Sequence, residues 1–117
     1  MKDKIDKIAE EDGRYNVEAI KFVYEGLGYT VKELADEPHH VSGQILSEGL
    51  SKMAIEKWGR LANLVLSNWN ITTTRDFGEI VYLMIDHQWM SAKDTDSIDD
   101  FNNVYDFNTV FKKQFKF

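Results

Sequence analysis

Four polar residues of this 117-residue chain have side chains that could do chemistry together: His40, Ser42, Asp76 and Glu79. Each is expected at or near the N-terminus of a predicted helix, where unpaired backbone N–H groups can bind an anionic ligand. The imidazole could also exchange protons. The alternative is that Ser42 and Asp76 only cap their helices and that Glu79 only complements the helix dipole. The sequence favours this second interpretation and predicts no catalytic residue.

The metal-binding and kinase patterns in the chain are incomplete. The three histidines, two of them adjacent, lack the spacing of zinc ligands, and the chain has no cysteine. Asp94-x-Asp96 begins like a calcium loop, but the next ligand position is Ile98, and the turn glycine and closing glutamate are missing. Asp76-Phe77-Gly78 spells the metal-binding triplet of protein kinases without the glycine-rich and catalytic loops. We therefore predict no metal and no cofactor, and we exclude a kinase.

The net charge of −6, from 20 acidic and 14 basic residues, disfavours binding to phosphate backbones or anionic lipid. No acid lies between Lys57 and Arg75, so any anion-facing surface would have to lie there. The absence of cysteine fits a reducing compartment. The N-terminus alternates charges where a signal peptide needs an apolar run, and the longest such run is only Ile80 to Ile85. The sequence thus predicts a cytoplasmic protein with no membrane segment, to which nucleic acid is poorly suited as a partner.

Apolar residues recur with helical spacing along nearly the whole chain. This predicts one all-α domain, residues 1–117, of about five to seven helices. Residues 1–13 are expected to form a loosely attached N-terminal helix, because only two large apolar side chains anchor it. A second helix starts near Tyr15 and weakens at Gly26 and Gly28. Residues 29–34 either continue it after a kink or form a short extended piece.

Helix-capping signals divide the second half of the chain. Ser42 is placed to cap a helix that Gly59 breaks or bends. Thr73 and Asp76 form a capping box for a helix that runs to about Met90. This helix is apolar on most sides and should be central. Two short terminal helices start at Ser97 with Asp100 and at Asp106. The predicted core contains Phe22, Leu46, Leu50, Leu64, Val65, Phe77, Ile80, Val81 and Met84, with Leu61 and Trp69 on the same stripe as Leu64 and Val65.

Residues 97–117 form an aromatic-rich C-terminal arm with five of the seven phenylalanines of the chain. Phe107, Phe111 and Phe115 recur with helical spacing, so this stripe must cover something apolar. Packing on its own domain is the favoured alternative. The other is an interface with a partner protein or a second copy, for which the candidate residues are Phe107, Phe111, Phe115 and Phe117.

Several phrases resemble a family of uncharacterised bacterial proteins. They are His40-Val41-Ser42-Gly43-Gln44, Leu46 to Gly49, Thr74 to Val81 with its Asp-Phe-Gly-Glu-Ile-Val, Asp96-Ser97 with Asp100-Phe101, and Val104-Tyr105-Asp106-Phe107. Together they look like small hypothetical proteins typical of Planctomycetes and Verrucomicrobia, over about residues 14–111. The resemblance implies a bacterial origin and a compact fold, and it supplies no catalytic residue. Trp58-Gly59-Arg60 departs from it, because the family more often shows Phe-Gly-Pro there.

Three classes of function stay open for such a chain. The first, which the aromatic content favours, is a non-catalytic protein–protein interaction module. The second is a small-molecule binder or enzyme that uses the polar set at helix N-termini. The third is a helix-turn-helix-like nucleic-acid binder built from residues 60–69 and the helix after Thr73. In the third class, Asp76 and Glu79 would face phosphate beside Arg75, which argues against it.

Overall fold

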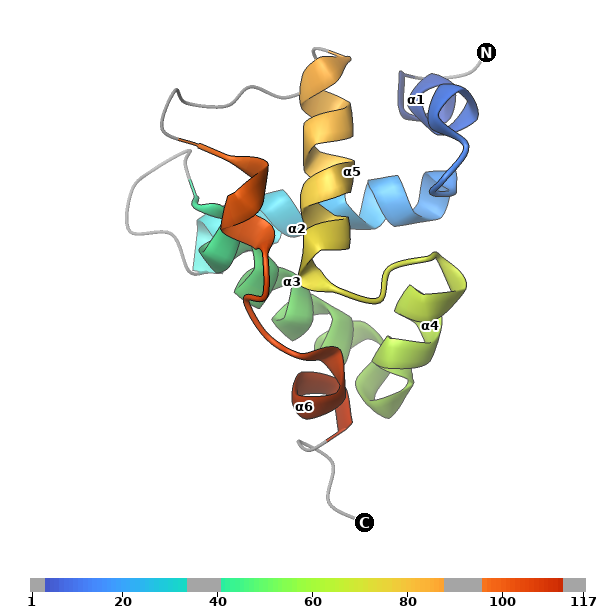
Figure 1. Cartoon of the computed structure of the whole chain (residues 1–117). Coiled ribbons are helices and arrows are strands. Elements are labelled where there is room, and N and C mark those ends of the chain that lie inside the picture. The colour runs from blue at the N-terminus through green and yellow to red at the C-terminus, as the bar shows by residue number, and fades with distance from the viewer. Residues whose placement is uncertain (1–3, 34–40, 88–95, 113–117) are drawn as a thin grey trace.

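The computed structural model describes residues 4–33, 41–87 and 96–112, without the side chains of Lys4 and Lys112. Within these ranges the chain forms helices and no strand, which confirms the predicted single all-α domain. The α-helices are α1 (Lys4–Asp12), α2 (Val17–Glu33), α3 (Gly43–Trp58), α4 (Ala62–Asn68), α5 (Thr74–Asp86) and α6 (Phe107–Lys112), and the 3-10 helices are η1 (Gly59–Leu61) and η2 (Ile98–Phe101). Figure 1 shows α5 standing across α2, with α1 on one side and η2 on the other.

Helix α1 ends where the sequence predicts. Gly13 follows it with a φ of 77°, a left-handed conformation that glycine adopts without steric cost, and its N–H donates to the Ala9 carbonyl at 3.0 Å. Both large apolar residues of the helix, Ile5 and Ile8, are buried in the core. How loosely residues 1–13 are attached stays a prediction.

Helix α2 continues through Gly26 and Gly28 as far as Glu33, which confirms that residues 29–33 continue the helix rather than form an extended piece, while the kink stays a prediction. Close packing against α3 explains why Gly26 does not end it. A Cβ on Gly26 would overlap the side chain of Leu50, and a Cβ on Gly49 would overlap Thr30. The two helix backbones can therefore approach closely. The packing this allows offsets the poor helix propensity of each glycine, which is about 1 kcal/mol.

Helix α3 begins and ends as the sequence predicts. Ser42 caps the helix, because its Oγ accepts from the backbone N–H of Ile45 at 3.2 Å. Gly59 ends it with a φ of 55°, and the chain turns through η1 into α4. The bend is therefore confirmed, and it reverses the direction of the chain at the lower end of the molecule in Figure 1.

The predicted register of α4 is wrong. Leu61 and Leu64 were expected on the core side, yet they are 56% and 58% exposed, and Val65 is only half-buried. The core side is occupied by Ala62 and Leu66, which are fully buried. Because apolar residues occur all around this short helix, spacing alone could not show which side faces inward.

Helix α5 has the predicted capping box and the predicted central position. It contacts α1, α2, α3 and η2, and Phe77, Ile80, Val81 and Met84 are all buried. Its last described residue is Asp86, capped by His87, and Met90 lies outside the described residues. Phe22, Leu46 and Leu50 join the same core as predicted.

The C-terminal part closes the core from the other side. The Ser97 and Asp100 capping box is present, but it starts the 3-10 helix η2 rather than an α-helix. Phe101 follows and lies against Gly43 of α3 and Gly78 of α5, where a Cβ on either glycine would crowd its ring. Asp106 then caps α6 by accepting from the N–H of Thr109 at 2.9 Å. Among the helices described, none has the length and apolar character needed to cross a membrane.

Candidate functional site

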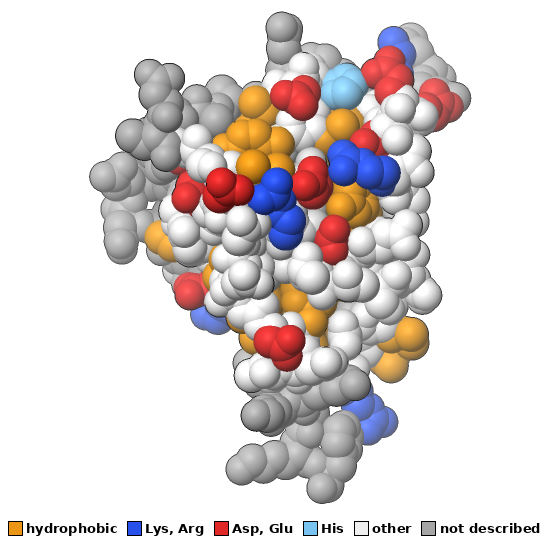
Figure 2. Space-filling model, in the orientation of Figure 1, with side chains coloured by type: hydrophobic (Ala, Val, Ile, Leu, Met, Phe, Trp, Pro, Cys, Tyr) orange, Lys and Arg blue, Asp and Glu red, His pale blue; other side chains and the backbone are white. Residues whose placement is uncertain are grey.

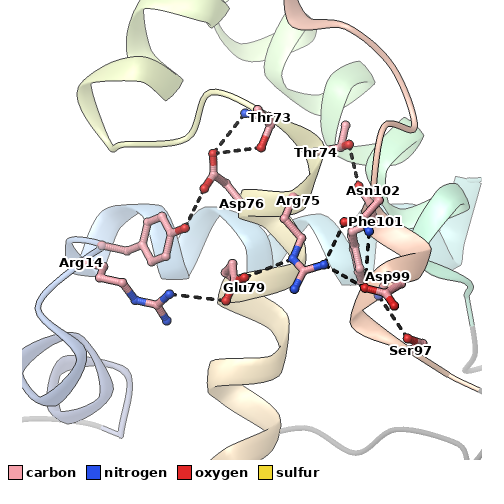
Figure 3. Close-up of polar contacts among 11 residues, drawn as sticks. Arg14, Thr73, Thr74, Arg75, Asp76, Glu79, Ser97, Asp99, Phe101 and Asn102 are labelled. Atoms are coloured by element: carbon pink, nitrogen blue, oxygen red, sulfur yellow. Dashed lines mark hydrogen bonds and ion pairs between the residues drawn. The ribbon is translucent and has the colours of Figure 1, made fainter.

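The polar residues of highest chemical interest gather at the N-terminus of α5, as Figure 3 shows. Asp76 closes the capping box, since its Oδ2 accepts from the N–H groups of Thr72 and Thr73 at 2.9 and 3.1 Å. Its Oδ1 accepts from the Tyr15 hydroxyl at 2.8 Å. Both oxygens of this carboxylate are therefore occupied by donors of the protein.

Glu79 lies one turn further along α5 and joins two arginines. Its Oε1 accepts from Nε of Arg75 at 3.1 Å, and its Oε2 pairs with Nη1 of Arg14 at 3.4 Å. Arg75 also pairs with Asp99 at 3.0 Å and donates to the Asn102 side chain at 2.9 Å. The α1–α2 loop, α5 and η2 are thus linked through one row of polar side chains (Figure 3). We call it the charged row and define it as Arg14, Tyr15, Arg75, Asp76, Glu79 and Asp99.

The protonation of this row suits a structural role. Burial, followed by the hydrogen bond to Asp76, raises the pKa of Tyr15 well above its ordinary value near 10, so the phenol stays a donor. Hydrogen bonds to Glu79 and Asp99 raise the already high pKa of Arg75. A phenol and an arginine held protonated cannot act as bases at neutral pH. The row can therefore fix three segments of the chain together.

The structure brings together two of the four predicted site residues. Asp76 and Glu79 do lie together, in the row just described. Ser42 lies at the start of α3, where its Oγ accepts from the Ile45 N–H, and no hydrogen bond among the described residues joins it to the other two. His40 lies outside the described residues. For Ser42 and Asp76, the geometry favours the capping interpretation over a ligand site.

An open cleft of about 710 Å³ lies beside this row. Asp6, Ala9 and Glu10 of α1 line one side, and residues 13–17 and 68–70 line the rest. Asn70 shapes the cleft by adopting a φ of 63° and donating from its side chain to the Arg14 carbonyl at 3.1 Å. The cleft could not be predicted from the sequence, because its walls come from three separate segments.

No group of three or more histidine and acidic side chains is placed to hold a metal ion in the part of the chain that the structure describes. Asp94 of the incomplete calcium pattern lies outside the described residues. His87 is engaged with oxygen atoms of the protein, at 2.9 Å from Nδ1 to the Leu83 carbonyl and 2.7 Å from Nε2 to Glu11.

The C-terminal arm is partly accounted for by the core of the chain itself. Phe107 is buried and Phe111 is only 1% exposed, and the centroids of the two rings lie 5.0 Å apart. This favours packing on its own domain for these two candidate interface residues, since neither ring is open to a partner. Phe115 and Phe117 lie outside the described residues.

A different surface carries the exposed apolar groups. We call it the α4 face and define it as Arg60, Leu61, Leu64 and Val65 of η1 and α4, of which the first three are exposed and Val65 is half-buried. Figure 2 shows hydrophobic side chains standing out at the lower right, over this part of the fold, with a basic side chain beneath them. Sequence reasoning placed the three apolar residues on one stripe but assigned that stripe to the core.

The chain finds no counterpart among known proteins in three comparisons. No family model matches its sequence, no curated protein matches it, and no solved structure matches its fold. What the chain does must therefore be inferred from its own surfaces.

Proposed function

We propose that this chain is a non-catalytic protein-interaction module that docks a partner on the α4 face. The observation that carries the proposal is the exposure of Leu61 and Leu64, each more than half open to solvent and one helical turn apart. Among the described residues, Tyr24 is the only other large apolar side chain that is exposed, at 43%. Covering two adjacent leucines would contribute roughly 25 cal/mol for each Å² of apolar surface removed from water.

The polar groups support the same proposal because they are already committed. Asp76 and Glu79 accept from Tyr15, Arg14 and Arg75 in the folded chain, and no open reactive side chain lies between them. A protein whose most reactive side chains hold its own loops together is better suited to binding than to catalysis. We also propose, from the sequence, that the chain is related to the bacterial family that it resembles and that it is located in the cytoplasm.

The test is a pull-down with the full chain and a variant of the α4 face. We expect wild type to retain a specific partner from a bacterial lysate and Leu61→Ser/Leu64→Ser to lose it, with the unfolding temperature little changed. Tyr24→Ser is the matched control, because it removes another exposed apolar side chain, from α2. Equal retention by the Leu61→Ser/Leu64→Ser variant would place binding elsewhere and contradict the proposal.

A second candidate is a binder of small polar molecules, favoured by the 710 Å³ cleft between α1 and the α4–α5 turn. Its volume lies within the usual range of ligand pockets, and Trp69 and three asparagines offer stacking and hydrogen bonds. Ligand-detected NMR with a set of polar metabolites tests it. Binding that Asn68→Lys abolishes and Leu61→Ser/Leu64→Ser preserves would favour the cleft over the α4 face.

Nucleic-acid binding stays the least supported of the three classes. The helix that would enter a groove is α5, and Arg75, the basic residue of its first turn, is paired with Glu79 and Asp99. We expect no saturable binding of a labelled DNA duplex at low salt, where phosphate contacts are strongest.

A further inference from the structure

The charges around the α4 face indicate what kind of partner it fits. The chain as a whole has 20 acidic and 14 basic residues, yet residues 58–74 contain no acid and include Arg60 on the face itself. Lys57 precedes the face at the end of α3, with a side chain that is 43% exposed and 3.7 Å from Glu25. Because Lys57 already pairs with Glu25, the positive charge that we assign to the face is that of Arg60, and an apolar pair beside an arginine is complementary to an apolar ridge that carries carboxylates.

On the side of the molecule that Figure 2 shows, the acidic side chains lie mainly away from the α4 face. Figure 2 shows the acids of this view concentrated over α5, η2 and α1, above the α4 face. In that row, Asp99 is already paired with Arg75, and Glu79 with Arg75 and Arg14. The arginines of the chain thus already balance these carboxylates, and a partner that carries carboxylates would meet attraction at Arg60 of the α4 face.

The size and shape of the face point to a short helix as the docking element. Leu61 and Leu64 are three residues apart and form a ridge one turn long, which matches the i, i+3 and i+4 spacing of an amphipathic helix. A face of four residues can bury far less surface than the roughly 1,600 Å² that a stable protein interface buries. The contact is therefore weak and transient.

A second copy of this chain fits the face less well. A twofold pair of α4 faces would bring Arg60 of each copy to the same contact, and both copies carry a net charge of −6. We propose that the occupant of the α4 face is an acidic amphipathic helix of another protein, an inference that rests on the proposed function.

The test uses two labelled peptides of about 18 residues with leucines at helical i, i+3, i+4 and i+7 spacing, one flanked by glutamates and one by lysines. Fluorescence anisotropy with the full chain at about 50 mM salt should give micromolar binding of the glutamate peptide, at least about tenfold tighter than that of the lysine peptide. Arg60→Glu should reduce or reverse the difference in affinity between the glutamate peptide and the lysine peptide. Leu61→Ser/Leu64→Ser should remove binding of the glutamate peptide, while Tyr24→Ser should not.

The outcomes separate the inference from the proposed function. Equal binding of both peptides that Leu61→Ser/Leu64→Ser abolishes would overturn the acidic partner and leave the docking face standing. Failure of both peptides to bind would overturn the inference, and unchanged binding of the glutamate peptide by Leu61→Ser/Leu64→Ser would overturn both. A dimer in sedimentation equilibrium that Leu61→Ser/Leu64→Ser dissociates would show that a second copy is the occupant and would likewise overturn the inference.

Discussion

Asp76 illustrates how a residue of reactive type can be fully used by the fold. Its carboxylate accepts from Thr72, Thr73 and Tyr15, so the helix start and the α1–α2 loop depend on the same side chain. The cap was predictable because it depends on residues only three positions apart. Its tyrosine partner, 61 residues away in sequence, was not, because local spacing says nothing about which distant loop packs beside a helix end.

Replacing Asp76 with alanine should lower the free energy of unfolding by about 1 to 2 kcal/mol, because the capping box is lost. Asp86→Ala is the matched control. It removes an exposed acid from the C-terminal end of α5, where a negative charge is unfavourable, and should be neutral or slightly stabilising. Urea denaturation of both variants measures the difference. Equal losses would show that the carboxylate of Asp76 has no special role.

His87 should make stability depend on pH. Both ring nitrogens lie within hydrogen-bond distance of oxygen acceptors, Leu83 O and Glu11 Oε2, and only the doubly protonated ring can donate to both. The Leu83 carbonyl, then Glu11, raises the pKa of His87 above its ordinary value of 6.5. The charges around the ring are Glu11 on α1 and the neighbouring Asp86 on α5.

A raised pKa means that the stabilisation is fully present below the unfolded value and is lost as pH rises through the folded value. The advantage of wild type over His87→Gln in unfolding free energy should therefore be fully present below the ordinary pKa of 6.5 and should shrink as pH rises through the raised pKa of the folded state. It should not exceed about 1 kcal/mol, because the pair is partly exposed. The comparison with the variant cancels the titration of the other histidines. If the advantage of wild type over His87→Gln in unfolding free energy grew with pH, this would contradict a raised pKa of His87.

At the scale of the elements, helix starts were predictable and helix orientations were not. Ser42, Thr73 and Ser97 lie at the beginnings of α3, α5 and η2 as the sequence indicated. The side of α4 that faces the core depends instead on the distant helices that pack against it. The continuation of α2 past Gly26 has the same origin, because Leu50 of the distant helix α3 packs against this glycine.

The close approach of α2 and α3 predicts opposite effects for two glycine-to-alanine changes. Gly49→Ala should destabilise the protein by about 1 to 3 kcal/mol, because the new methyl group would overlap Thr30, whose hydroxyl is held by the Gly26 carbonyl at 2.6 Å. Gly28→Ala, with open space at the Cβ position, should stabilise by roughly 0.5 to 1 kcal/mol. Thermal unfolding measures both. Stabilisation by Gly49→Ala would rule out the tight crossing.

The register of α4 is tested by two leucine truncations on opposite sides of the helix. Leu66→Ala should cost about 2 to 5 kcal/mol, because Leu66 is fully buried. Leu64→Ala should change stability by no more than about 0.5 kcal/mol, since that side chain is mostly exposed. The opposite ranking in chemical denaturation would restore the register expected from the sequence and remove the α4 face.

Across the whole molecule, charge and apolar exposure are separated in space. Glu79 and Asp99 are tied into a row over α5 and η2, while the exposed leucines of η1 and α4 lie in a stretch of sequence without acids. The fold class and the acid-free stretch could be read from the sequence. The exposed leucines could not, because exposure is set by which surface remains after all helices have packed.

Position-resolved photo-crosslinking in living cells tests the docking claim most directly. A photoreactive residue is placed at Leu64, at Tyr24 as an exposed control on α2, or at Asn16 in the cleft wall. The α4 face predicts a discrete adduct from position 64 that Leu61→Ser weakens, and none from positions 24 and 16. Adducts from position 16 alone, or no adduct from position 64, would contradict it.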